Sequence, residues 1–160
     1  MTLEEKIQSF IVEQGKTLAL AESCTGGSLS ARLVALPGAS DYFLGSLVTY
    51  SNALKRELLG VSAETLRVHG PVSRETAHEM LIGLLKRTDT HYGIAVTGVA
   101  GPTGGTKEKP VGTVWIAVGC PGVKPRVHEH HFSGERAAII ASTVEAALND
   151  LASFLPVIAT

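Results

Sequence analysis

Short apolar runs typical of buried strands alternate along this chain with segments spaced like amphipathic helices. No repeat, linker or low-complexity tract interrupts this order. Alternation of this kind favours helices packed on both faces of a mainly parallel sheet. We therefore predict an α/β fold, a three-layer α/β/α sandwich around a mainly parallel (mixed) sheet, in a single domain covering residues 1–160.

Start and stop signals place the predicted elements along the chain. Thr2 and Glu5 have the spacing of a capping box for a first helix that Gly15 ends, and Ser62 and Ser73 are plausible N-caps of later helices. We expect strands at residues 17–21, 43–50, 92–97, 111–118 and 126–132, the last at an edge of the sheet. Further helices are expected at 28–36, 52–59 and about 134–154, the last with an apolar stripe of Ile140, Val144, Ala147, Leu148, Leu151 and Leu155.

The composition excludes several classes of protein. The chain has 160 residues, 44% hydrophobic and 18% charged, which is enough for one apolar core. A formal net charge of -1 gives no electrostatic case for nucleic acid or an anionic membrane. We find no apolar run near the ~18 residues of a membrane span and no signal-peptide pattern in residues 1–6. Cys24 and Cys120 cannot form a disulfide framework, so we expect a cytoplasmic protein with reduced cysteines.

Glycine-rich turns follow two of the expected strands, at residues 22–27 and 98–106. The second turn carries four glycines and two hydroxyls, and such a loop brings backbone N–H groups close to an anion. Ligands of open α/β sheets bind outside the carboxyl ends of the strands. Two such turns side by side therefore predict one binding cleft, with a mobile surface loop as the alternative for residues 98–106.

The turn at residues 22–27 offers a nucleophile beside the free N–H groups of a helix N-terminus. Ser23 is placed to attack a carbonyl while the N–H groups near Gly26 and Gly27 receive the oxyanion. In the alternative interpretation, Ser23 or Thr25 simply caps the helix. The spacing does not choose between Ser23 and Thr25 as the nucleophile, and we expect Cys24 to be a packing residue.

A second cluster contains Tyr50, Ser51, Asn52 and Lys55. If a helix begins at Asn52, Lys55 projects from its first turn, where a cation opposes the helix dipole. The lysine could bind an anion, act as a general base for a serine, or lie solvated on the surface. The base role requires a pKa lowered from ~10.4 to about 7–8, at a cost of roughly 3–5 kcal/mol in desolvation or positive neighbours.

Histidine and arginine add two weaker candidate sites. A strand at 126–132 places His128 and His130 on one face, but we see no third ligand at a typical spacing and expect no metal. Arg136 opens the final helix, where its charge is unfavourable, while its planar guanidinium suits phosphate. A surface role for Arg136 is equally open.

At these residues the chain resembles the C-terminal domain of the competence/damage-inducible protein CinA, a family whose standalone members are nicotinamide-nucleotide amidohydrolases. The resemblance covers nearly the whole chain and follows its order. The matching blocks are Ala21-Glu22-Ser23-Cys24-Thr25-Gly26-Gly27, Val48-Thr49-Tyr50-Ser51-Asn52 with Lys55, His69-Gly70-x-Val72-Ser73, Thr97-Gly98-x-Ala100-Gly101-Pro102-x-Gly104-Gly105, Lys109-Pro110-Val111-Gly112-Thr113-Val114 and Ser133-Gly134-x-Arg136.

The resemblance implies hydrolysis of nicotinamide mononucleotide to nicotinate mononucleotide and ammonia, in pyridine nucleotide salvage. It implies Ser23 as nucleophile and Lys55 as its base, with Tyr50 in the catalytic site to relay or orient the proton. The expected substrate-binding residues are Thr25, Gly26, Gly27, Ser51, Asn52, Thr97, Gly98, Ala100, Gly101, Gly104, Gly105 and Arg136.

This chemistry needs no metal or redox cofactor, and its partner is a small nucleotide. We also expect a homo-oligomer, a dimer or larger, with residues 111–118 or the final helix as possible interfaces. The alternatives are a non-catalytic nucleotide-binding or partner-binding domain, and a hydrolase acting on a related pyridine nucleotide or amide.

Overall fold

The structure is a computed structural model that describes residues 1–159 and the side chains of residues 1–155. Its strands are β1 (Leu18–Glu22), β2 (Phe43–Val48), β3 (Tyr92–Gly98), β4 (Thr113–Gly119) and β5 (Arg126–His131). Its helices are α1 (Leu3–Glu13), α2 (Ser28–Val34), the 3₁₀ helix η1 (Ala39–Asp41), α3 (Asn52–Leu59), α4 (Ala63–His69), α5 (Arg74–Thr88) and α6 (Arg136–Ala159). The predicted elements are confirmed, with shifts of one or two residues at most ends.

The five strands form one mixed sheet in the order β2-β1-β3-β4-β5. β1 runs parallel to both of its neighbours, while β3–β4 and β4–β5 are antiparallel. β4 reverses direction because it follows β3 through a loop, without the crossover helix that a parallel pair needs. The carboxyl ends of β1 and β3 therefore lie side by side, and the two glycine-bearing turns leave the same edge of the sheet.

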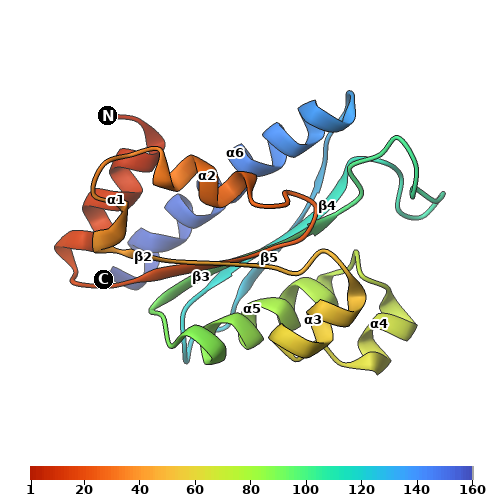
Figure 1. Cartoon of the computed structure of the whole chain (residues 1–160), viewed down its shortest axis with the longest axis horizontal. Coiled ribbons are helices and arrows are strands. Elements are labelled where there is room, and N and C mark those ends of the chain that lie inside the picture. Colours follow the sequence, from red (N-terminus) through yellow and green to blue (C-terminus); the bar gives the residue numbers. More distant parts are fainter. Residues whose placement is uncertain (160) are drawn as a thin grey trace.

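Two helical layers cover the sheet, α1, α2 and α6 on one face and α3, α4 and α5 on the other (Figure 1). The side chains of β1 alternate between these layers. Leu18 and Leu20 belong to the core beneath α1, α2 and α6, whereas Ala19 and Ala21 face the core beneath α3 and α5. The three-layer sandwich predicted from the sequence is thus confirmed.

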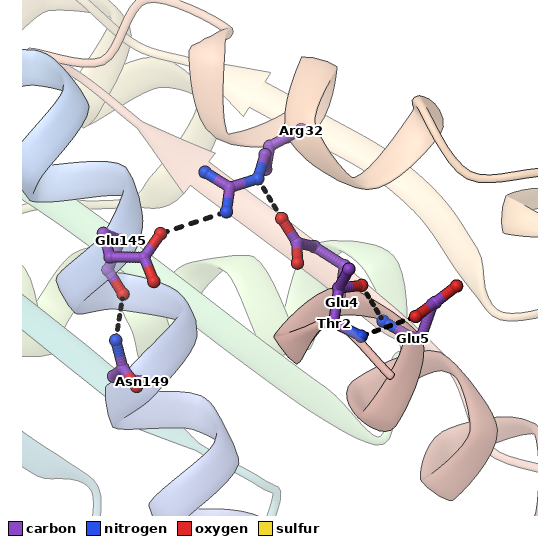
Figure 2. A network of polar contacts seen from close by, with 6 residues as sticks. All are labelled: Thr2, Glu4, Glu5, Arg32, Glu145 and Asn149. Carbon is purple, nitrogen blue, oxygen red and sulfur yellow. Dashed lines mark hydrogen bonds and ion pairs between the residues drawn. The ribbon is translucent and has the colours of Figure 1, made fainter.

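Arg32 ties together the three helices of the first layer. Its guanidinium pairs with Glu4 of α1 on one side and, at 3.0 Å, with Glu145 of α6 on the other (Figure 2). Thr2 and Glu5 form the predicted capping box at the start of α1. These contacts fix the layer that covers β1, the strand that leads into Ser23.

The final helix corrects two expectations from the sequence. By length and composition, residues 136–155 of α6 are long and apolar enough to span a membrane, although we expected no such segment. The helix packs across the sheet as a core element, with Ala147, Leu148 and Leu151 fully buried. Its buried stripe begins at Ile139 rather than Ile140 and includes the buried Thr143. Thr143 can lie within the apolar face because its hydroxyl donates to the Ile139 carbonyl at 2.7 Å.

The strand at residues 111–118 is not available as a subunit interface. β4 lies between β3 and β5, and six of its seven residues are buried. Its apolar side chains face the two helical layers, which explains why its sequence looks like an interface. A homo-oligomer stays a prediction, without this strand as its contact.

Candidate active site

Ser23 and Lys55 meet at the carboxyl edge of the sheet. Ser23 directly follows β1, and Lys55 lies in α3, whose N-cap is Ser51. The Lys55 Nζ atom is 2.8 Å from the Ser23 Oγ atom. Both side chains are buried, with Lys55 only 1% exposed. The hydroxyl and the amine are thus in direct contact, away from bulk water.

The other neighbours of the Lys55 amine determine which group of the Ser23–Lys55 pair donates the hydrogen bond when the amine is neutral. Nζ donates to the backbone carbonyls of Thr49 at 2.8 Å and Tyr50 at 3.2 Å, and carbonyls can only accept. In the neutral amine these two bonds use both N–H groups, so the lone pair faces the Ser23 hydroxyl. Burial lowers the pKa of Lys55 to about 8. The neutral form of Lys55 can therefore accept a hydrogen bond from the Ser23 hydroxyl.

Glu22, to which no role was assigned from the sequence, holds the turn around Ser23. Its fully buried carboxylate accepts hydrogen bonds from backbone N–H groups and hydroxyls of the following turn, of α2 and of β2. Burial alone raises the pKa of this carboxyl, but the bonds from hydroxyls and amides outweigh it and hold the pKa below its ordinary value. The donors are Thr25 Oγ1, Gly27 N, Leu29 N, Ser30 N, Ser30 Oγ and Ser46 Oγ.

These bonds settle which hydroxyl faces the lysine and correct the expected oxyanion site. Thr25 donates to Glu22 at 2.7 Å, so Ser23 is the hydroxyl in contact with Lys55. The Gly27 N–H is bound to Glu22, and the Gly26 N–H is bound to the Ser23 carbonyl at 3.1 Å. Neither is free to receive an oxyanion. Within residues 1–155, the backbone N–H of Cys24 makes no hydrogen bond to another residue.

A pocket of about 150 Å³ opens onto Ser23 and Lys55. Of the predicted substrate-binding residues, Thr25, Gly26, Gly27, Ser51, Gly101, Gly104 and Gly105 do not line it. Larger hollows exist elsewhere, but this pocket contains the serine–lysine contact. Its lining comprises Ser23, Cys24, Tyr50, Asn52, Lys55, Pro71, Val72, Thr97, Gly98, Ala100 and Arg136.

Three residues that were not predicted as site residues also line the pocket, namely Cys24, Pro71 and Val72. Thr97 brings in the segment after α4, because its hydroxyl donates to the Pro71 carbonyl at 2.7 Å. The sequence block His69-Gly70-x-Val72-Ser73, which resembles the CinA family, already pointed to this segment. Burial raises the pKa of the Cys24 thiol to about 12, which suits a packing residue and not a nucleophile.

Arg136 closes one side of the pocket from the first residue of α6. Its guanidinium donates to the Gly101 carbonyl at 2.7 Å and to the Tyr50 hydroxyl at 3.0 Å. Tyr50 is 60% exposed, and its hydroxyl pairs with Arg136 and not with Ser23 or Lys55. The contact that the predicted proton relay through Tyr50 requires is therefore not formed. A guanidinium has five N–H donors, so three remain for a ligand.

The family model of the CinA C-terminal domain matches residues 1–155. The chain belongs to the CinA C-terminal domain family. CinA-like proteins of Thermotoga maritima and Syntrophobacter fumaroxidans are 44% and 48% identical to it over 158 and 146 residues. These matches cover 96% and 91% of this chain, but 37% and 34% of the two relatives. The chain thus spans about a third of the length of these curated relatives.

Solved structures of the CinA family have the same fold. The competence/damage inducible protein CihA from Agrobacterium tumefaciens superposes with a TM-score of 0.90 at 40% identity, covering 92% of this chain and 90% of that one. The competence damage-inducible protein A (ComA) from Klebsiella pneumoniae gives 0.92 at 37% identity, covering 96% and 95%. The fold of this CinA domain is therefore shared over nearly its whole length.

The glycine-rich loop of this CinA domain extends beyond the sheet between β3 and β4 (Figure 1). Only Gly98 and Ala100 of its predicted binding residues line the pocket, and Gly104 and Gly105 are exposed. Gly101 has a φ of +75°, and a Cβ there would lie 2.4 Å from the Val111 Cγ1 atom. This glycine therefore serves the folding of the loop onto itself, which a larger residue would prevent.

Proposed function

We propose that this CinA domain deamidates nicotinamide mononucleotide to nicotinate mononucleotide and ammonia. The observation that carries the proposal is the buried contact between Ser23 and Lys55, 2.8 Å long, in which two carbonyls occupy the remaining sides of the amine. A hydroxyl is a weak nucleophile until an adjacent base takes its proton. A lysine with a pKa near 8 is neutral often enough at neutral pH to be that base.

The reaction proceeds through a covalent acyl-enzyme. Ser23 Oγ attacks the carboxamide carbon, and the serine proton moves to Lys55 Nζ. The tetrahedral intermediate collapses, the C–N bond breaks, and Lys55 returns the proton to the leaving ammonia. A water molecule then attacks the ester on Ser23 and gives a proton to Lys55. The bond between the acyl carbon and Ser23 Oγ breaks, Lys55 returns this proton to Oγ, and the acid leaves. One water is consumed for each amide cleaved, and the serine is regenerated.

The oxyanion of the intermediate is assigned to the backbone N–H of Cys24. Cys24 follows the nucleophile and lines the pocket, and its N–H makes no hydrogen bond to another residue within residues 1–155. The Gly26 and Gly27 N–H groups are engaged elsewhere. An N–H group held by the surrounding turn stabilises developing negative charge without reorganisation, which is where such donors contribute most.

The rest of the nucleotide lies outside the pocket. A volume of about 150 Å³ is smaller than the roughly 300–1,000 Å³ of most ligand sites, so it accommodates the carboxamide-bearing ring but not a whole mononucleotide. Arg136 at the rim has donors left for the phosphate. Because the phosphate is remote from the reacting carbon, its binding can hold the amide in attack geometry.

Ammonia release from three amides tests the proposal. We expect turnover of nicotinamide mononucleotide, slower turnover of nicotinamide riboside, which lacks the phosphate, and the slowest reaction with free nicotinamide. Faster turnover of a different amide would be consistent with a hydrolase but would contradict nicotinamide mononucleotide as the substrate. Thermal stabilisation by the mononucleotide without any ammonia release would instead indicate a non-catalytic nucleotide-binding domain.

A further inference from the structure

Two histidines of β5 and one aspartate of α6 lie together, away from the candidate active site. His128 and His130 are two residues apart in the strand and so lie on the same face, toward α6. Asp150 meets both of them. Its Oδ2 atom is 2.9 Å from His130 Nε2, and its Oδ1 atom is 3.7 Å from His128 Nδ1.

The three side chains differ in how firmly they are held. The His130 ring stacks on Phe132 with an interplanar angle of 13°, and the side chain of Asp150 is only 14% exposed. The side chain of His128 is 49% exposed, so its ring has room to turn. Two ligands are thus fixed in place and the third is adjustable.

We propose that His128, His130 and Asp150 form a binding site for a divalent transition metal of the Zn²⁺ class. One ligand atom from each residue lies within 4.8 Å of the other two. Tetrahedral zinc with bonds of about 2.0–2.1 Å needs ligand atoms roughly 3.3 Å apart, a gap that a rotation of the exposed His128 ring closes. Two imidazoles and one carboxylate suit Zn²⁺, Ni²⁺ or Cu²⁺, whereas Mg²⁺ prefers oxygen ligands.

No metal site was predicted because the third ligand could not be identified from the spacing of residues along the chain. Asp150 lies 20 positions after His130, on a helix rather than on the strand. Only the packing of α6 over β5 brings it close. The bound metal would link the edge strand of the sheet to the helix that carries Arg136, and a ligand of the folded state alone stabilises that state.

Binding of Zn²⁺ to the untagged protein tests this site. We expect one Zn²⁺ per chain by equilibrium dialysis, and a rise in melting temperature of roughly 5–10 °C at a hundredfold excess over the dissociation constant. His130→Ala and Asp150→Asn should lose the tight binding and the shift. His131→Ala, on the opposite face of the same strand, is the matched control and should keep both.

Each remaining outcome decides the question. Equal binding by wild type and the His128→Ala/His130→Ala double variant would overturn the site, as would a wild type that binds no Zn²⁺. An equal shift with Mg²⁺ would overturn the transition-metal assignment. If His130→Ala fails to fold, loss of binding in His128→Ala, at a half-exposed position, supports the site, and full retention overturns it.

Discussion

Lys55 reaches Ser23 from a helix that begins 29 positions after it in the chain, and the two side chains meet at 2.8 Å in the interior. The turn that carries Ser23 is fixed by Glu22 beneath it, while the amine of Lys55 is fixed by two carbonyls beside it. Neither partner needs to move for a proton to pass between them. In the proposed mechanism, the reactivity of the pair therefore depends on the protonation state of Lys55.

The first prediction concerns the pH dependence of the reaction. Because the pKa of Lys55 is lowered to about 8, kcat/KM for the mononucleotide should rise through pH 8 as the amine becomes neutral, and then level off. Initial rates of ammonia release between pH 6 and 10 measure this. Lys55→Arg stays protonated throughout and should show a low, flat profile. A wild-type rate that falls or stays constant over this range would contradict the base role.

The same lowered pKa affects stability. Between the folded pKa of about 8 and the ordinary 10.5, the unfolded chain binds more protons, so the free energy of unfolding gains a positive slope with pH. Relative to Lys55→Met, wild type should gain about 2–3 kcal/mol from pH 7 to pH 10. Urea unfolding of both proteins at the two pH values checks this. The exposed Lys86→Met is the control, and an equally large change there would refute the assignment.

Glu22 is expected to matter for both stability and turnover. In Glu22→Gln an amide NH₂ group replaces one of the two carboxylate oxygens. Both oxygens accept hydrogen bonds from buried N–H groups, so the NH₂ group, itself a donor, would face other donors in the interior. We expect a loss of about 1–3 kcal/mol in the free energy of unfolding, and roughly a tenfold or larger fall in kcat as Ser23 is misplaced. The exposed Glu57→Gln should change neither. Wild-type values in Glu22→Gln would rule out its positioning role.

Arg136 should act on the phosphate and little on the chemistry. Removing a charged hydrogen-bond donor typically costs 1.5–3 kcal/mol, so Arg136→Ala should lower kcat/KM for the mononucleotide roughly 10- to 100-fold. Nicotinamide riboside, without a phosphate, should be affected less than about threefold. Equal losses on both substrates would mean that Arg136 serves only to hold Tyr50 and Gly101. Arg87→Ala on α5 controls for the loss of a surface charge.

Much of the architecture could be predicted because local signals agree with it. The capping box of Thr2 and Glu5 and the N-caps Ser62 and Ser73 all depend on neighbours within a few residues. The positions of Ser23 and Lys55 at element ends were predictable for the same reason. Their contact was expected only from the family resemblance, because it depends on β1 lying between β2 and β3, and no local pattern encodes strand order.

The parts that sequence reasoning missed are long-range pairings. Glu22 looks like a turn residue, and its role exists only because Ser30 of α2 and Ser46 of β2 converge on it. In the sequence, the polar Thr143 interrupts the apolar stripe of α6. In the structure it is buried within that stripe, because its hydroxyl donates to a carbonyl of its own helix. Asp150 gains two histidine neighbours only through the packing of α6 on β5. In each case a polar group finds its partner through tertiary structure.

The most direct measurement is ammonia release by Ser23→Ala beside Ser28→Ala, an exposed serine at the first position of α2. If Ser23 is the nucleophile, Ser23→Ala should lose at least about a thousandfold in kcat while keeping its melting temperature, and Ser28→Ala should turn over like wild type. Ser23→Ala that releases ammonia at the wild-type rate would contradict the central claim.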